Sequence, residues 1–193
     1  GWIRAMRGEG EESLALCRSG LQHAPDPFAE AVGRGYLGYA HLQREEAATA
    51  VGLFEDAVNS WKAFDVPQLE GWIGAWLAEA LLGTGNVDRA RGRADEALRV
   101  ARAARFPFAI GLALAAQGRI AKAAGRLDEA AARLEEALDV LSAIGARYEA
   151  ARARLDLAVV AHSRGRRDAA ASHLDEARRA FELWTGAHLS DEL

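Results

Sequence analysis

The sequence predicts an all-α fold in which antiparallel helix hairpins stack into a right-handed α-solenoid of about four and a half repeats. Three observations predict this fold. A residue pattern recurs with a period of about 40 residues, each unit contains two apolar-periodic segments, and a glycine separates the two segments. Leu, Ala, Arg and Glu dominate both segments and the chain has only 4 prolines, so both segments are expected to be amphipathic helices.

The period is visible at four positions of the repeat. Gly85, Gly125 and Gly165 are each one period apart. The same step separates three further sets: Asp88, Asp128 and Asp168; Ala90, Ala130 and Ala170; Ala97, Ala137 and Ala177. Upstream, the frame continues at Ala50 and Ala57, and after a slightly shorter step at Ser13 and Gly20. Small residues at these positions let paired helices approach closely, whereas the larger Phe54 and Leu134 are expected to wedge between them.

The repeat frame divides the chain into a series of elements. We expect one domain, 1–193, made of a partial repeat at 1–27, repeats at about 28–67, 68–107, 108–147 and 148–185, and a tail at 186–193. In each repeat the glycine suits a left-handed residue that closes the first helix, and the aspartate lies in the first turn of the second helix, where it meets the helix dipole. Pro67 and Pro107 mark the ends of second helices. The chain begins without Met and as though a helix were under way, so we expect it to be a fragment of a larger protein.

The order Leu37-Gly38, Ala50-x-x-x-Phe54 and Ala57 resembles the tetratricopeptide repeat signature. The resemblance covers Trp2 to Leu183, although Arg34 replaces the usual first-helix Trp and the repeat is about six residues longer than usual. Repeats of this length are similar to the MalT-like repeats in the C-terminal regions of bacterial multidomain regulators. Those regulators include cyclase or kinase proteins with an AAA-type ATPase, and LuxR-type transcription activators. The resemblance implies a non-catalytic cytoplasmic module that binds a protein, a peptide or domains of its own parent chain.

Composition and charge exclude several classes of protein. Acidic and basic residues are interspersed and the formal net charge is −4, so the chain lacks the basic patch of a nucleic-acid-binding protein. No apolar run reaches the ~20 residues of a membrane helix, and we expect no membrane partner. The single cysteine, Cys17, excludes an internal disulfide, which suits a reducing cytoplasmic setting.

The segment Gly33 to Gly38 fits the pattern G-x-G-x-x-G, which is typical of phosphate-binding loops. A dinucleotide site needs a buried strand before this pattern, and the preceding residues 25–32 have a helical pattern instead. In the repeat frame Gly38 aligns with Ala78, Gly118 and Ala158, where paired helices touch. We therefore expect the glycines to serve helix packing, and a nucleotide-binding enzyme fragment that uses Gly33–Gly38 remains the alternative.

Titratable residues do not form a recognisable active site. Cys17 aligns with Phe54 and Leu134 and is expected to be a buried thiol rather than a nucleophile. The five histidines include no pair at the i, i+4 spacing of helical metal sites. Adjacent acids such as Glu135 and Glu136 point about 100° apart on a helix. We therefore expect no catalysis, no metal and no cofactor.

Binding is the function that the sequence favours. In a solenoid of this kind the first helices of successive repeats line a concave groove. We expect the groove to display Tyr36, Tyr39, Trp72, Trp76, Glu79, Arg119, Lys122, Arg152 and His162. Aromatic anchors beside charged groups are what a peptide groove requires. Two alternatives stay open: the rings fill space between the helices, or the module mediates self-association through an uncovered apolar end.

Overall fold

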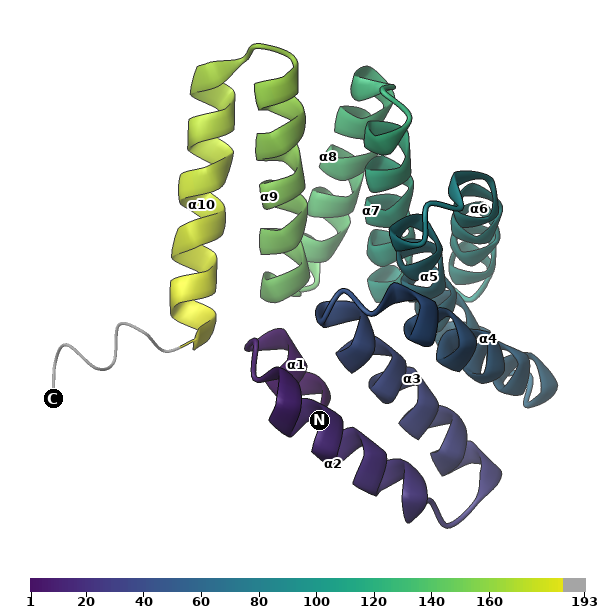
Figure 1. The fold of residues 1–193 in the computed structure, drawn as a ribbon. Helices are drawn as coiled ribbons and strands as arrows, with labels where there is room; N and C mark the ends of the chain where they lie inside the picture. The colour runs from purple at the N-terminus through teal and green to yellow at the C-terminus, as the bar shows by residue number, and fades with distance from the viewer. Residues whose placement is uncertain (186–193) are drawn as a thin grey trace, which may run out of the picture.

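The computed structural model describes residues 1–185, which fold into ten helices (Figure 1). The helices are α1 (Trp2–Met6), α2 (Gly10–Gln22), α3 (Pro27–Gln43), α4 (Ala47–Ala63), α5 (Pro67–Gly83), α6 (Val87–Ala103), α7 (Pro107–Ala123), α8 (Leu127–Ala143), α9 (Arg147–Ser163) and α10 (Arg167–Thr185). Among these residues there is no strand, and consecutive helices run antiparallel. The predicted all-α solenoid is confirmed. The tail predicted at 186–193 lies outside the described residues.

The regular unit of the backbone is one helix followed by one short turn. The helices from α3 to α9 are equal in length, and three residues connect each of them to the next helix. The middle residue of each connection has a positive φ: Glu45, Asp65, Gly85, Arg105, Gly125, Gly145 and Gly165. The expected left-handed glycine after the first helix is confirmed at Gly85, Gly125 and Gly165. The same geometry also closes the second helices, where Asp65 and Arg105 adopt it without being glycine.

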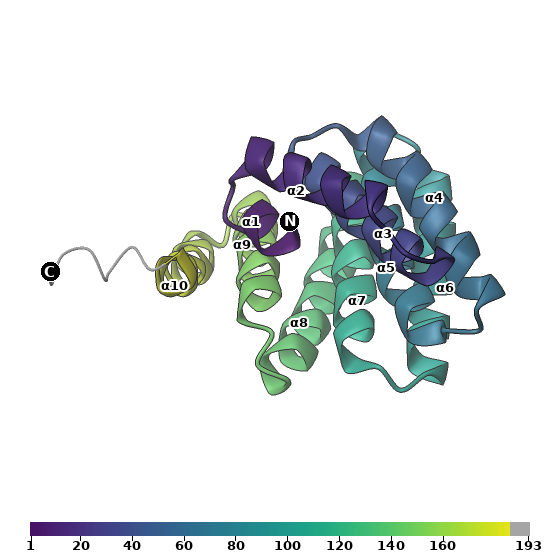
Figure 2. The ribbon, with the colours of Figure 1, turned by 90° about the horizontal axis from the view of Figure 1, so that it is seen from below.

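The helices form two layers. Each second helix packs against the first helix of the next hairpin, and α5 also packs against α7. The first helices α3, α5, α7 and α9 therefore form the inner layer of the curved array, and α4, α6 and α8 form the outer layer (Figure 2). The short helix α1 packs against α2 and α3 on the inner side (Figure 2).

Prolines set where the first helices begin. Pro27, Pro67 and Pro107 occupy the first turn of α3, α5 and α7, where the missing N–H of proline costs no hydrogen bond. At α3 the side chain of Asp26 also caps the helix, because its Oδ1 accepts from the backbone N–H of Ala29 over 2.7 Å. The starts of α3, α5, α7 and α9 are evenly spaced along the chain, each one repeat after the last.

Glycines allow the two helices of a hairpin to approach closely. A Cβ atom on Gly38 would lie 2.8 Å from Cε1 of Phe54, and one on Gly118 would lie 2.6 Å from Cγ of Leu134. Phe54 and Leu134 have no exposed surface, so the expected wedge positions are confirmed. The segment Gly33 to Gly38 lies inside α3, where its backbone belongs to a continuous helix. It therefore lacks the loop that cradles a phosphate, and the nucleotide-site alternative is wrong about the local structure.

Within residues 1–185, no helix combines the length and the apolar character that a membrane crossing needs.

Candidate functional site

Two groups of side chains meet on the inner layer. The aromatic cluster joins α1, α3, α5 and α7 and consists of Trp2, Tyr36, Tyr39, Trp72, Trp76 and Phe108. The ion-pair cluster joins α5, α7 and α9 and consists of Glu79, Arg119, Lys122, Glu149, Arg152 and Asp156. Since first helices of successive hairpins lie side by side, residues that are a repeat or more apart in sequence become neighbours here.

The aromatic cluster is built around Trp72 of α5. The Trp72 ring makes edge contacts with Trp2 at 5.4 Å, with Trp76 at 5.2 Å and with Phe108 at 5.1 Å between ring centroids. The ring of Trp2 also stacks on Tyr36, with centroids 5.6 Å apart and planes inclined by 2°. Trp2, Tyr36, Trp72 and Phe108 are half-buried, so part of each side chain remains accessible on the inner surface.

Tyr39 and Trp76 do not lie on the outward side of the first helices, where the repeat frame predicts them. Tyr39 is 0% and Trp76 is 1% exposed. Their ring centroids are 4.4 Å apart, and the ring centroid of Phe54 in α4 is 6.1 Å from that of Trp76. The rings fill the space between α3, α4 and α5, which is the core alternative considered above. The structure therefore places these two residues in the core.

Arg119 of α7 is the centre of the ion-pair cluster. Its Nη1 donates to Oε2 of Glu79 in α5 over 2.9 Å, and its Nε donates to Oδ2 of Asp156 in α9 over 2.6 Å. Lys122 Nζ donates to the other oxygen of Asp156 over 3.1 Å. Arg152 donates from Nη2 to Glu79 and from Nη1 to Oε2 of Glu149, the latter over 3.2 Å. Three first helices are thus joined through charged side chains.

Burial and mutual attraction set the pKa values in this cluster. Burial opposes ionisation of Glu79 and Asp156, but the positive charge of Arg119 outweighs it with the help of Arg152 or Lys122, so the pKa of each of these two carboxyls is lowered. Glu149 behaves differently because burial dominates over the attraction of Arg152, and the pKa of Glu149 is raised. The pKa of Arg119 is raised by its acidic neighbours in spite of its burial.

The charged residues expected in the groove mostly bind one another. The side chains of Glu79, Arg119 and Arg152 are 17%, 12% and 15% exposed, so little of their surface is accessible to a partner. Lys122 is 29% exposed and is the most accessible cation of the cluster. His162 lies exposed in the last turn of α9 and forms none of the described ion pairs of the cluster. The structure thus brings together eight of the nine predicted residues in two clusters.

The partners of the predicted residues include Asp156, Glu149 and Trp2, which the repeat frame does not predict to be in the site. In the repeat frame Asp156 aligns with Ala116 and Trp76, so an acid stands in a position that is otherwise small or aromatic. The acid at this position indicates that a cationic partner lies nearby, since a charge at a buried position needs a partner. Glu149 aligns with Ala109 and Leu69 in the same way. The repeat frame predicts no role for Trp2, because Trp2 precedes the first whole repeat and has no equivalent residues in it.

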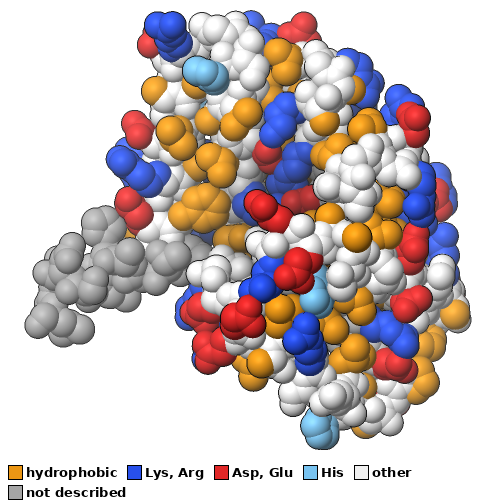
Figure 3. Space-filling view, viewed as in Figure 1, with side chains coloured by type: hydrophobic (Ala, Val, Ile, Leu, Met, Phe, Trp, Pro, Cys, Tyr) orange, Lys and Arg blue, Asp and Glu red, His pale blue; other side chains and the backbone are white. Residues whose placement is uncertain are grey.

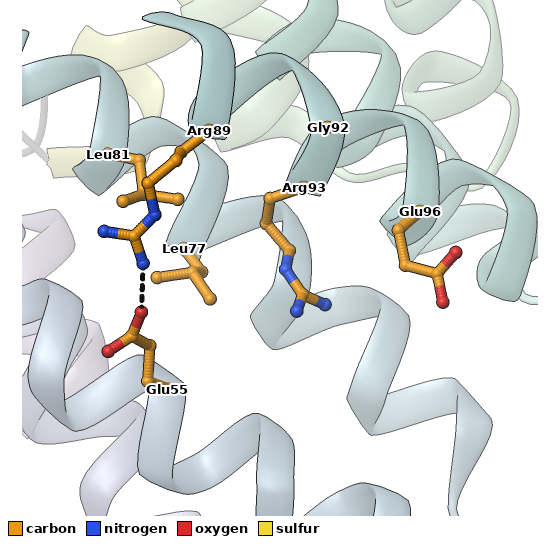
Figure 4. Close-up of a pocket in the computed structure, with 7 residues that line it drawn as sticks. All are labelled: Glu55, Leu77, Leu81, Arg89, Gly92, Arg93 and Glu96. Atoms are coloured by element: carbon orange, nitrogen blue, oxygen red, sulfur yellow. Dashed lines mark hydrogen bonds and ion pairs between the residues drawn. The ribbon is translucent and has the colours of Figure 1, made fainter. Parts of the chain in front are cut away.

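Depressions on the surface fall on both layers. On the inner side, a cavity of about 230 Å³ is lined by Trp2, Met6, Phe108, the turn at 145–147, Tyr148 and Glu149. On the outer side, a notch between α4 and α6 contains the ion pair of Glu55 and Arg89, at 2.6 Å, together with Arg93 and Glu96 (Figure 4). A similar notch follows one repeat later, with Asp95 and Arg133 in the places of Glu55 and Arg93. The outer notches are therefore features of the repeat.

Charge and apolar surface are unevenly distributed on the face shown in Figure 3. Positive and negative side chains are mixed between α9 and α7, whereas apolar side chains show over α9 and α10. Leu155 and Val159 of α9 and Leu174 of α10 are 42%, 45% and 51% exposed. Within the described part of the chain, no group of three or more His, Cys, Asp or Glu residues is arranged to hold a metal ion.

Comparison with solved structures shows the same fold at low sequence identity. A Rap protein complexed with competence and sporulation factor matches 95% of this chain with a TM-score of 0.79 and 15% identity, and this chain spans 53% of that protein. BtubC (BKLC) from P. vanneervenii matches 95% with a TM-score of 0.65 and 18% identity, over 77% of its own length. A signal transduction ATPase with numerous domains from Pyrococcus horikoshii, which has a tetratricopeptide repeat sensor, matches 96% with a TM-score of 0.63 and 18% identity, over 29% of its own length.

Comparison with protein families identifies the repeat itself. Among curated proteins no sequence match was found. The family model of the tetratricopeptide repeat matches residues 77–125 and 121–182, which together make up more than half of the chain. The matched region contains the whole ion-pair cluster and the regularly spaced turns from Gly85 to Gly165. The chain therefore belongs to the tetratricopeptide repeat family.

Proposed function

We propose that this chain is a non-catalytic interaction module that binds a peptide or an extended protein segment on the inner layer of the solenoid. The observation that carries the proposal is the meeting of four half-buried aromatic rings, Trp2, Tyr36, Trp72 and Phe108, on one inner surface. Aromatic side chains contribute most of the affinity in peptide and protein interfaces, because they bury a large area at a small cost in side-chain entropy.

The ion-pair cluster supports the same function. It holds α5, α7 and α9 at fixed spacing, so the inner surface is organised before a partner arrives. Lys122 keeps part of its side chain accessible beside the cluster and would attract an acidic residue of the partner. In the proposed mechanism, apolar side chains of the partner bind to the aromatic rings near α1, α3 and α5. Charged side chains near α7 and α9 then select partners of complementary charge.

The wider setting is also a proposal. The tetratricopeptide repeat family and the likeness to a Rap protein solved with a competence and sporulation factor support a binding module. The likeness to an ATPase with a tetratricopeptide repeat sensor supports a role beside effector domains. We infer that the chain is the MalT-like repeat part of a larger cytoplasmic bacterial signalling or transcription-regulatory protein, whose partner is another protein or a domain of the parent chain.

Selection from a library of random dodecapeptides on the folded protein tests the proposed function. We expect selected peptides to bind Trp72→Ala at least about tenfold more weakly than the wild type, since a central aromatic anchor contributes more than about 1.4 kcal/mol. Phe64→Ala is the matched control, because Phe64 is a 39% exposed aromatic residue at the end of α4 in the outer layer.

Circular dichroism must show unchanged helical content in both variants. Equal binding of every selected peptide to wild type and Trp72→Ala would contradict the proposed surface. Failure to select any peptide on the folded protein would contradict the proposed function.

Self-association is a second candidate, and a different observation favours it. Leu174 is 51% exposed, although the equivalent residues Phe54 and Leu134 are fully buried. With Leu155 and Val159 it forms an apolar surface on α9 and α10 that a second copy would cover. Multi-angle light scattering would show a dimer that Leu174→Asp converts to a monomer. A wild type that stays monomeric at about 100 μM, a concentration on the order expected for weak association, would exclude it.

A further inference from the structure

The inner cavity at the start of α9 combines an apolar wall with a charged group. Its volume is about 230 Å³, which is several times the ~30 Å³ of one water molecule. Aromatic side chains line it from three helices: Trp2 of α1, Phe108 of α7 and Tyr148 of α9. The space therefore suits a ligand side chain that presents a long apolar stem and ends near the carboxyl of Glu149.

Glu149 is the unusual member of this wall. The residue is 3% exposed, and its Oε2 accepts a hydrogen bond from Nη1 of Arg152 over 3.2 Å. Its Oε1 is buried and has no hydrogen-bond partner among the described residues. A buried carboxyl oxygen without a donor is unfavourable, so the folded chain holds an acceptor that a ligand would satisfy favourably.

We propose that this cavity binds a primary ammonium group of a peptide ligand, which donates to Oε1 of Glu149. The inference rests on the proposed function, because it specifies which group the inner surface recognises. Two sources carry this group: a lysine side chain and a free amino terminus. The aromatic residues Trp2, Phe108 and Tyr148 line the same cavity, and aromatic rings attract cations.

The single free oxygen favours an ammonium over a guanidinium. A guanidinium pairs best with both oxygens of a carboxylate in a fixed fork, and Oε2 of Glu149 is already bound to Arg152. An ammonium is a compact charge whose three donors need only one oxygen here. The stem of a lysine would lie against the aromatic rings, as long charged side chains commonly do on apolar surfaces.

The neighbouring charges predict how variants behave. Arg152 also binds Glu79, so it is already committed to the cluster. Arg119 also acts on Glu149, but it donates to Glu79 and Asp156. Arg147 lines the cavity and is exposed. A bound ammonium would be repelled by Arg147, whereas an anionic ligand would be attracted to it. Removal of Arg147 therefore has opposite effects on the two kinds of ligand.

Titration of three short peptides into the full chain tests the assignment. The probes are acetyl-Gly-Lys-Gly-amide, its uncharged analogue acetyl-Gly-norleucine-Gly-amide, and Gly-norleucine-Gly-amide with a free amino terminus. Binding is followed through the indole N–H resonance of Trp2 in NMR spectra, assigned with Trp2→Phe. We expect either the lysine peptide or the free-amine peptide to bind at least about tenfold more tightly than the uncharged analogue, and the stronger of the two identifies the source.

Two variants separate charge recognition from a general structural effect. Glu149→Gln should remove the preference for the ammonium peptide, and Arg147→Ala should strengthen its binding. Equal binding of charged and uncharged peptides to the wild type would overturn the inference without any variant, and so would weaker binding to Arg147→Ala. If library-selected peptides depend on Trp72 while the ammonium preference is missing, only this inference fails; if no peptide depends on Trp72, the proposed function fails as well.

Discussion

The Nε atom of Arg119 donates to Oδ2 of Asp156 over 2.6 Å between α7 and α9, and the two side chains are only 12% and 16% exposed. The same guanidinium donates to Glu79 of α5, so one arginine joins three consecutive first helices. Buried pairs of this kind contribute little net stability compared with an apolar core, but removal of one partner leaves the other charge buried and unpaired. The stability of the inner layer is therefore sensitive to each member.

Arg119→Ala should lower the free energy of unfolding by about 3 kcal/mol, because it leaves Glu79 and Asp156 without their shared donor. Arg99→Ala is the control, since Arg99 pairs with Glu96 on the exposed outer side and exposed pairs contribute little. Urea denaturation followed by circular dichroism measures both. Equal shifts of the unfolding midpoint in the two variants would show that the cluster contributes no more than a surface ion pair.

Gly38→Ala should destabilise the protein by about 1–3 kcal/mol, because the added methyl group would lie 2.8 Å from the buried Phe54 ring. Gly52→Ala is the matched helical control and meets no atom within 4 Å, so it should stabilise by about 0.5–1 kcal/mol. Thermal unfolding distinguishes the two. Stabilisation by both substitutions would mean that α3 and α4 are farther apart than described.

Arg105→Gly should stabilise the protein by about 1 kcal/mol, because Arg105 holds a φ of 50°, a conformation that costs a residue with a Cβ about 1–2 kcal/mol. Gly125→Ala, at a φ of 73° in the next connection along the chain, should destabilise by a similar amount. Urea unfolding of the two variants gives the comparison. Destabilisation by Arg105→Gly would mean that the Arg105 side chain contributes more than its backbone costs.

Acid should weaken the ion-pair cluster. The pKa of Asp156 is lowered in the folded protein, so the unfolded chain binds a proton first as the pH falls below the ordinary value of 3.8. Its stabilising contribution is therefore present above that pH and is lost as the pH falls towards its lower folded pKa, and Glu79 acts in the same direction. The pKa of Glu149 is raised in the folded protein, so its effect has the opposite sign: the protein loses stability as the pH rises above the ordinary value of 4.5.

The corresponding measurement is the unfolding free energy of wild type and Asp156→Asn between about pH 2.5 and 6. The wild type should lose more stability than the variant below about pH 4, because the variant has no carboxyl to protonate at this position. Parallel curves for the two proteins would show that Asp156 is not selectively stabilised in its ionised form.

The architecture could be predicted from sequence because small residues and left-handed turns recur at fixed spacing. Gly85, Gly125 and Gly165 marked the hairpin turns, and each has the expected positive φ. The turns between repeats were harder to recognise, since Asp65 and Arg105 adopt the same backbone conformation without a glycine. Local residue type identifies such a turn only when glycine occupies it.

The site was only partly predictable because burial depends on neighbouring repeats. Tyr39 and Trp76 share helix faces with accessible residues, yet the close approach of α3, α4 and α5 buries them. The pairing of Glu79 with Arg152 joins helices two repeats apart and follows from the curvature of the array, which a repeat frame alone does not supply. The sequence therefore predicts which helices form the site, but the structure is needed to show which side chains on those helices are accessible.

NMR chemical-shift mapping with a library-selected peptide shows which layer of the solenoid binds. The largest shifts should fall on α3, α5, α7 and α9, with Tyr36 and Trp72 among the residues affected, and the outer notch at Arg89 and Arg93 should not respond. Shifts confined to α4, α6 and α8, or centred on the outer notch, would contradict binding on the inner layer.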